Sequence, residues 1–147
     1  MAKPLVYFLC TGNSCRSQMA EGWGRHLGGD LWEVASAGIS PTHVHPQAVA
    51  AMAEVGVDIS AQSSKPVDAA TVARAAVVVT LCGDAADRCP VVPPGTLRLH
   101  WPFPDPARIQ GSPAEIADAF RRVRDEIADR VRALRAEWER VPPAGRP

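Results

Sequence analysis

Cys10 and Arg16 are the pair of residues whose types and spacing most directly suggest chemistry. Five residues separate them, and a loop of this length between a strand and a helix can fold into a cradle of backbone N–H groups. The dipole of the helix and the guanidinium of Arg16 would attract a tetrahedral oxyanion. The same positive field stabilises a cysteine thiolate, which is the nucleophilic form. The motif therefore predicts an activated nucleophile, Cys10, beside a site for phosphate or an anion of the same shape.

The residues predicted to bind the anion are those of the loop itself: Thr11, Gly12, Asn13, Ser14, Cys15, Arg16 and Ser17. Ser17 can donate its hydroxyl to the thiolate or cap the helix that follows. A cysteine and an arginine at this spacing also occur by chance at a buried strand end, so only the strand–turn–helix context favours the functional interpretation. Cys15 is either a backup thiol or a small packing residue, and we favour packing because no chemical step requires it.

Asp105 is the candidate general acid. It lies between Pro104 and Pro106, whose rings restrict the backbone and so hold the carboxyl group in one place. A carboxylic acid positioned in this way can protonate a departing oxygen, which contributes about a hundredfold to ten-thousandfold to the rate of such a step. An Asx turn before proline is the alternative interpretation. The Cys10–Arg16 loop makes the catalytic one preferable.

Composition excludes several classes of protein. The 147 residues, 46% of them hydrophobic, suit one globular domain with a core. Sixteen Lys and Arg residues balance sixteen Asp and Glu residues, so nucleic acid is not an expected partner. No apolar run approaches the roughly 20 residues that span a bilayer, and no cleavable leader is evident. We therefore expect a cytoplasmic protein without a membrane partner.

The chain has four cysteines, and the two not yet discussed are Cys82 and Cys89. Reductants of the cytosol argue against structural disulfides, which leaves catalysis, redox exchange or metal binding. The spacings of the cysteines differ from the Cys-x2-Cys pattern of common zinc sites, and Arg16 would repel a cation. We expect no metal. His43 and His45 are interpreted as part of a solvated loop rather than as metal ligands.

The elements that position these residues alternate between strands and helices. Apolar or alternating runs predict strands over 5–10, 32–37, 76–82 and 96–100, and helical spacing predicts helices over 17–27, 46–55, 69–73 and 113–140. Asp68 is the expected cap of the third helix, and Ser112 with Glu115 forms a capping box for the fourth. Gly28–Gly29 would end the first helix through a positive φ, and residues 102–106 would form a rigid, non-helical turn.

This alternation predicts an α/β fold in which a doubly wound parallel sheet of about four strands is flanked by helices. In such sheets ligands bind at the carboxyl ends of the strands, which is where Cys10 and Cys82 are expected. We expect a single domain over residues 1–141, followed by a disordered tail over 142–147.

The residues from Cys10 to Ser17, together with Asp105–Pro106 ahead of the last helix, resemble the low-molecular-weight protein tyrosine phosphatase fold family. The pair Cys82 and Cys89 is not needed by a phosphatase. Residues 10–24 are similar, almost throughout, to the thioredoxin-coupled arsenate reductase family. The resemblance covers the chain up to the tail and implies a low-molecular-weight phosphatase-like fold.

The resemblance also implies a mechanism, in which arsenate is reduced to arsenite by a relay of three cysteines for arsenic detoxification. Cys10 would attack arsenate held by Arg16, while Asp105 protonates the departing hydroxide. Cys82 would then attack Cys10 and release trivalent arsenic, and Cys89 would form the redox-active Cys82–Cys89 disulfide. Thioredoxin, supplied by thioredoxin reductase and NADPH, would reduce that disulfide. No bound cofactor is expected, and the enzyme is expected to act as a monomer.

Geometry adds an expectation about the segment between the last two thiols. If residues 82–89 were helical, the Cα atoms of its ends would be about 10.5 Å apart along the axis, beyond the roughly 7 Å limit for a disulfide. The segment must therefore loop or unwind on oxidation. Gly83 and Pro90 at its edges suit such a change.

Three alternatives remain open from the sequence. A true tyrosine phosphatase would carry aromatic side chains around the acid loop, whereas Ala107 and Arg108 follow Asp105–Pro106, so only a weak phosphatase side activity is expected. A redox switch without enzymatic activity would leave Arg16 and Asp105 without a purpose. Arsenate reduction with a low-molecular-weight thiol as reductant would need fewer protein thiols than this chain has.

Overall fold

The computed structural model describes residues 3–83, 92 and 94–140. The strands are β1 (Leu5–Cys10), β2 (Glu33–Gly38), β3 (Val77–Cys82) and β4 (Arg98–Phe103). The helices are α1 (Arg16–Gly28), α2 (Pro46–Ala53), α3 (Ala69–Arg74) and α4 (Pro113–Arg140), with a short 3-10 helix, η1 (Pro106–Arg108). Cys89, most of the 82–89 segment and the predicted tail lie outside the described residues.

The four strands form one parallel sheet in the order β2-β1-β3-β4, which confirms the predicted sheet. The two central strands, β1 and β3, are buried along their whole length. Their continuous apolar sequences follow from this position, because both faces of a central parallel strand are covered. The central strands end at Cys10 and Cys82. Both cysteines therefore lie at the carboxyl ends of neighbouring parallel strands, as predicted.

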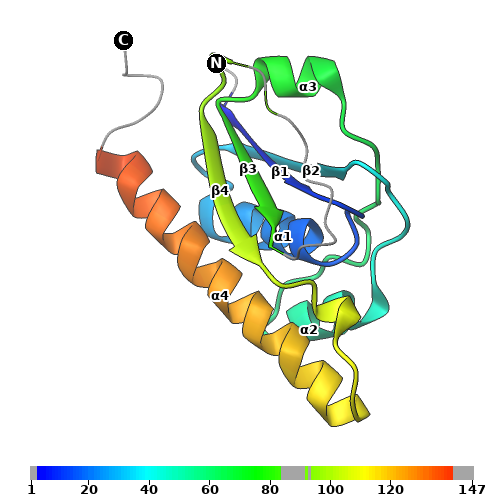
Figure 1. Cartoon of the computed structure of the whole chain (residues 1–147). Helices are drawn as coiled ribbons and strands as arrows, with labels where there is room; N and C mark the ends of the chain where they lie inside the picture. The colour runs from blue at the N-terminus through cyan, green and yellow to red at the C-terminus, as the bar shows by residue number, and fades with distance from the viewer. Residues whose placement is uncertain (1–2, 84–91, 93, 141–147) are drawn as a thin grey trace.

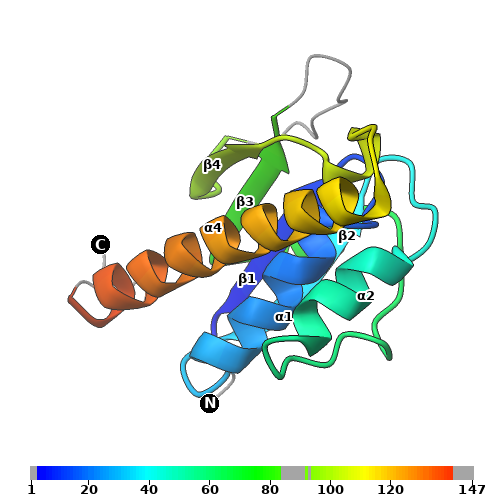
Figure 2. The ribbon, with the colours of Figure 1, turned by 90° about the horizontal axis from the view of Figure 1, so that it is seen from below.

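The sheet separates two unequal layers. Val6 and Phe8 of β1 pack into the large core with α1, α2 and α4, whereas Tyr7 and Leu9 point to a smaller cluster that includes Val72 of α3. Figures 1 and 2 show α1, α2 and α4 together on one side of the sheet, with α3 apart from them. The alternation along β1 thus assigns three helices to one face and one short helix to the other.

Helix α4 begins and ends as the sequence predicts. The backbone N–H of Glu115 donates to Ser112 Oγ at 3.2 Å, and the Glu115 carboxylate accepts from the backbone N–H of Ser112 at 3.1 Å. The helix has 28 residues. Its far end is held by Trp138, whose ring meets that of Trp32 edge to face at 5.0 Å. No helix among the described residues combines the length and the apolar character needed to cross a membrane.

The first helix stops for a different reason from the one predicted. Gly29 has a φ of −63°, so no left-handed residue ends α1. A Cβ on Gly28 would overlap the indole of Trp32, and a Cβ on Gly29 would lie 2.5 Å from the carbonyl oxygen of Arg25. These glycines are therefore required by close contacts. Helix α2 ends at Ala53, two residues earlier than predicted, and the chain turns at Gly56, whose φ is +80°.

The region before the candidate acid also differs from the prediction. Strand β4 extends to Phe103, three residues further than expected, and passes through Pro102. Because β4 is an edge strand, a residue without an N–H is tolerated there. Pro106 then begins the 3-10 helix η1 where a non-helical turn was predicted. Proline suits the first position of a helix because its φ is already helical and its missing N–H would have no partner there.

Replacing Gly28 with alanine tests the close packing at the end of α1. Glycine in a helix is ordinarily less favourable than alanine by up to about 1 kcal/mol. Here the added methyl group would overlap the buried ring of Trp32, and overpacking of this kind costs about 1–3 kcal/mol. We expect Gly28→Ala to lower the free energy of unfolding in urea. An unchanged or raised value would contradict the packing argument.

Candidate active site

Cys10 occupies the strand–loop–helix setting that the sequence predicted. It is the last residue of β1 and is 2% exposed, while α1 begins six residues later at Arg16. The sulfur of Cys10 lies 2.8 Å from Oγ of Ser17. Of the two roles predicted for Ser17, the structure supports the contact with sulfur. The N-cap of α1 is Cys15, which makes no side-chain capping bond.

Four successive carbonyl groups of the loop are bonded to the protein around it. Those of Thr11, Gly12, Asn13 and Ser14 accept, in this order, from the N–H of Ser40, the N–H of Thr42, Nε2 of Gln18 and the N–H of His45 at 2.9–3.2 Å. In a planar trans peptide the N–H points opposite to the C=O. The N–H groups of these peptides therefore face the other side of the loop, where the pocket lies. This orientation is the one that the predicted anion cradle requires, and the loop leads into the positive end of α1.

Asn13 holds the loop in a conformation that few residues adopt. Its φ of 46° is positive, which among the described residues other than glycine occurs only here. The fully buried side chain donates from Nδ2 to Ser17 Oγ at 2.7 Å and to Ser36 Oγ at 2.9 Å. Gly38 packs directly against the backbone of the loop. A Cβ on Gly38 would lie 2.7 Å from the backbone nitrogen of Asn13 and from the carbonyl oxygen of Thr11. The loop needs both residues for its shape.

The guanidinium of Arg16 contacts the ends of two strands, β3 and β4. Nη1 donates to the carbonyl oxygens of Phe103 at 3.1 Å and Leu81 at 3.5 Å, and Nη2 lies 3.8 Å from the Asp105 carboxylate. The residue is 2% exposed. Its position at the first turn of α1 thus links the anion loop to the ends of β3 and β4.

Asp105 lies in the same pocket as Cys10 and Arg16, so the structure brings three of the predicted catalytic residues together. Cys82, the other predicted catalytic residue that the structure describes, is not part of the lining of this pocket. Its Oδ1 accepts from the N–H of Ala107 at 3.0 Å, which caps η1. Nε of Arg108 is 3.7 Å from the other oxygen. The Asx-turn interpretation and the catalytic one are therefore compatible, because the capping bond fixes one oxygen and leaves the carboxyl group beside the cradle.

The pocket is a cavity of about 350 Å³. Sequence reasoning missed six of its lining residues: Ser40, Thr42, His43, His45, Ala107 and Arg108. The first four follow β2, and their role could have been expected because loops after the carboxyl ends of parallel strands border ligand sites. Within the described chain, no group of His, Cys, Asp and Glu residues is arranged to hold a metal ion.

His45 contributes to the pocket from the start of α2. Its Nδ1 accepts from the N–H of Gln47 at 3.1 Å and so caps that helix. Burial lowers the pKa of His45, as does the neighbouring His43, while Asp105 raises it. The neutral imidazole that this favours is the form able to accept the capping bond. The predicted solvated loop is correct for the exposed His43, but His45 is half-buried.

Cys15 and Cys82 are both buried, in different settings. Burial, followed by the charge of Asp105, raises the pKa of Cys15 to about 12, so this thiol keeps its proton at neutral pH. That agrees with the packing role favoured for it. Cys82 ends β3, and the next residue, Gly83, packs so closely on the Phe103 backbone that a Cβ would collide with it.

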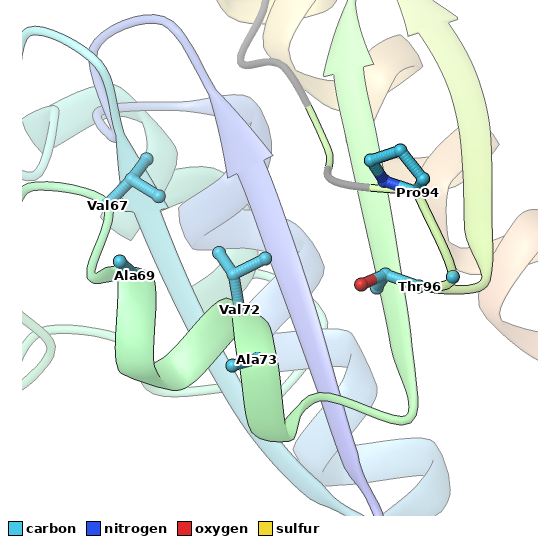
Figure 3. A pocket seen from close by; sticks show the side chains of 7 residues that line it. Val67, Ala69, Val72, Ala73, Pro94 and Thr96 are labelled. Atoms are coloured by element: carbon cyan, nitrogen blue, oxygen red, sulfur yellow. The ribbon is translucent and has the colours of Figure 1, made fainter.

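A second cavity lies on the other face of the sheet. It measures about 570 Å³ and is bordered by α3 and the turn that precedes β4. Figure 3 shows Val67 and Val72 on one side of it, with Pro94 and Thr96 opposite. None of the lining residues that the structure describes is ionisable. The described part of this larger cavity therefore lacks the groups that the predicted chemistry requires.

Comparison with known proteins agrees with this geometry. The family model for low molecular weight phosphotyrosine protein phosphatases matches residues 5–142. An arsenate reductase of Bacillus subtilis (strain 168) is 56% identical over 132 residues, which cover 90% of this chain and 95% of that protein. A solved arsenate reductase in the phosphate binding state has a TM-score of 0.75 at 37% identity, covering 91% of this chain and 98% of its own.

A further solved relative is a thioredoxin-dependent arsenate reductase of Corynebacterium glutamicum. It has a TM-score of 0.73 at 30% identity, and the match covers 94% of this chain and 63% of that one. Given these matches over most of its length, the chain belongs to the low molecular weight phosphotyrosine protein phosphatase family and, within it, to the arsenate reductases.

The raised pKa of Cys15 predicts a dependence of stability on pH. Because the thiol keeps its proton in the folded state and loses it near pH 9 when unfolded, its contribution is complete below pH 9 and is lost above it. Between pH 8 and pH 10 the loss is about 1.4 kcal/mol. The Cys15→Ala variant has no thiol at this position, so its free energy of unfolding does not include this loss. The difference in unfolding free energy between parent and variant, from urea titrations, should therefore shrink by that amount; a constant difference would contradict the assignment.

Proposed function

We propose that this chain is an enzyme that reduces arsenate to arsenite, takes its electrons from thioredoxin and serves arsenic detoxification. The observation that carries the proposal is the convergence of Cys10, Arg16 and Asp105 on one small pocket. The pocket belongs to a chain that is 56% identical to an arsenate reductase. Arsenate is a tetrahedral oxyanion, which is the shape and charge that the backbone cradle suits.

In the first step the thiolate of Cys10 attacks arsenic and a sulfur–arsenic bond forms. One oxygen of arsenate leaves as hydroxide and takes a proton from Asp105. The loop amides from Thr11 to Ser17 and the guanidinium of Arg16 bind the remaining oxygens. The outward carbonyl groups of the loop support this role, because they leave the N–H groups on the pocket side.

The second step moves two electrons to arsenic. The thiolate of Cys82 attacks the sulfur of Cys10, the sulfur–arsenic bond breaks, and its electron pair stays with arsenic, which leaves as trivalent arsenite. Two thiolate sulfurs are thereby oxidised to a Cys10–Cys82 disulfide. The thiolate of Cys89 then attacks Cys82, which releases Cys10 and leaves the redox-active Cys82–Cys89 disulfide.

Neighbouring strands support the contact between Cys10 and Cys82. Strands β1 and β3 pair directly, with Leu9 opposite Thr80. Cys10 is the next residue of β1 and Cys82 lies two residues further along β3, so the two cysteines end neighbouring strands at the same end of the sheet. Arg16 contacts the oxygen of Leu81, which immediately precedes Cys82. An anion bound by Arg16 would thus lie near the end of β3.

A dithiol of thioredoxin, kept reduced by thioredoxin reductase and NADPH, then restores the two protein thiols. We propose no bound cofactor. A weak phosphatase side activity follows from the shared cradle, but the lining of the acid loop does not suit a phosphotyrosine ring, because Ala107 and Arg108 border the pocket there. A tyrosine phosphatase is therefore the less favoured assignment.

Thioredoxin-coupled oxidation of NADPH in the presence of arsenate tests the relay. We expect the parent chain to turn over and Cys89→Ser to stop after one cycle, because Cys10 then stays in a disulfide. Cleavage of p-nitrophenyl phosphate, which needs only the cradle and Cys10, should be feeble and equal in both. Brisk phosphate-ester cleavage without arsenate turnover would instead identify a phosphatase.

A separate test concerns the acid. Asp105→Asn keeps the oxygen that caps η1 but cannot supply the proton, so release of arsenite in a single turnover without thioredoxin should slow by about a hundredfold to ten-thousandfold. Asp118→Asn is the control, since that carboxylate pairs with Arg121 on the exposed side of α4. A loss below tenfold in Asp105→Asn, or an equal loss in the control, would remove Asp105 from this step.

A further inference from the structure

His45 joins the start of α2 to the anion loop. Its backbone N–H donates to the carbonyl oxygen of Ser14 at 3.1 Å, and its side chain caps α2 by accepting from the N–H of Gln47 at 3.1 Å. Its ring centroid lies 5.0 Å from that of Phe120, which is fully buried. Pro46, next in the chain, restricts the backbone of the residue before it. The imidazole is therefore held in one place, where it borders the pocket of the anion loop.

The capping bond decides which ring nitrogen of His45 carries the proton. A backbone N–H can only donate, so Nδ1 of His45 must accept and has no hydrogen of its own. In a neutral imidazole the other nitrogen, Nε2, is then the donor. The neutral form is favoured by burial, which together with His43 lowers the pKa of this ring, although Asp105 raises it. The cap thus leaves one N–H of the ring for a further acceptor.

Donors for an oxyanion in this pocket can come from two segments of the chain. The loop amides and the guanidinium of Arg16 belong to the turn from β1 into α1. Four further lining residues belong to the 40–45 segment: Ser40, Thr42, His43 and His45. Three of these four are exposed, whereas His45 is half-buried. A donor that is fixed and partly removed from water interacts more strongly with a charge than one that turns freely in solvent, so His45 is the residue of this segment best suited to bind an anion.

We propose that His45 is a substrate-binding residue, whose Nε2–H donates to an oxygen of the bound tetrahedral oxyanion. The inference rests on the proposed oxyanion pocket and adds to it a neutral donor from a segment outside the loop between Cys10 and Arg16. The side chain serves two functions through different atoms, because Nδ1 caps α2 and Nε2 binds the ligand. Substitutions can therefore separate the two.

Asparagine and glutamine each replace one of the two nitrogen atoms. In His45→Asn the side-chain oxygen can take over the cap, since asparagine is among the preferred N-cap residues, but nothing replaces Nε2–H. In His45→Gln the longer side chain carries its amide NH2 to about the reach of Nε2, whereas glutamine is not among the preferred caps. His26→Asn makes the same change on the exposed last turn of α1 and is the matched control.

Inorganic phosphate is the probe for this test. Its binding is measured by the protection of Cys10 from iodoacetamide at neutral pH and constant ionic strength, quantified on the Cys10 peptide by mass spectrometry. The half-protecting concentration does not depend on the rate without phosphate, so a change in the reactivity of Cys10 does not distort it. We expect this concentration to rise about tenfold in His45→Asn, as for the loss of a hydrogen bond to a charged group, with an unchanged midpoint of urea unfolding. His45→Gln should retain most of the affinity and unfold at a lower urea concentration.

Several outcomes would overturn the proposal. One is a parental half-protecting concentration in His45→Asn, and another is an equal rise in His26→Asn. A loss of affinity in His45→Gln as large as that in His45→Asn would do the same, as would unfolding of His45→Asn at a lower urea concentration, since the cap that sets the tautomer would then be misassigned.

The assay contains no arsenate, so it separates this inference from the proposed function. Protection of Cys10 by phosphate in a chain that does not turn over arsenate would refute the proposed function and leave the role of His45 unchanged. Absence of protection in the parent chain would overturn the oxyanion pocket and, with it, this inference.

Discussion

A buried cation at the positive end of a helix is the constraint on which the rest of this structure depends. Arg16 begins α1 and is 2% exposed, and both its burial and the helix dipole disfavour its charge. The carbonyls of Leu81 and Phe103 and the carboxylate of Asp105 offset that cost. They come from the ends of β3 and β4, so the parallel sheet brings together what the arginine requires. A bound oxyanion would add further negative charge to the same place.

The anion loop depends on support from segments that are distant in sequence. Its carbonyl groups accept from residues of the 40–45 segment and from Gln18, and Gly38 allows the strand beside it to approach the backbone. The loop is therefore shaped before any ligand arrives. Preorganised donors of this kind stabilise charge that develops during a reaction without the cost of reorienting them.

The sequence predicted those parts of the fold that local patterns determine. Each of these features depends on a few residues that are neighbours in sequence: the apolar runs of β1 and β3, the capping box at Ser112, and the Cys10–Arg16 spacing. The structure agrees with each of them. The sequence could not place His45 in the pocket, because this position is far along the chain from the loop that it borders. Strand β4 was predicted too short, since Pro102 is compatible with a strand only at a sheet edge.

That edge position has a consequence for how the protein behaves among copies of itself. An exposed parallel edge offers a row of unpaired backbone groups to which another strand can add, and such edges are common starting points for aggregation. In β4 the row is interrupted, because Pro102 has no hydrogen to donate. The residue before which the predicted strand ended thus makes this edge of the sheet a poorer template for a fifth strand.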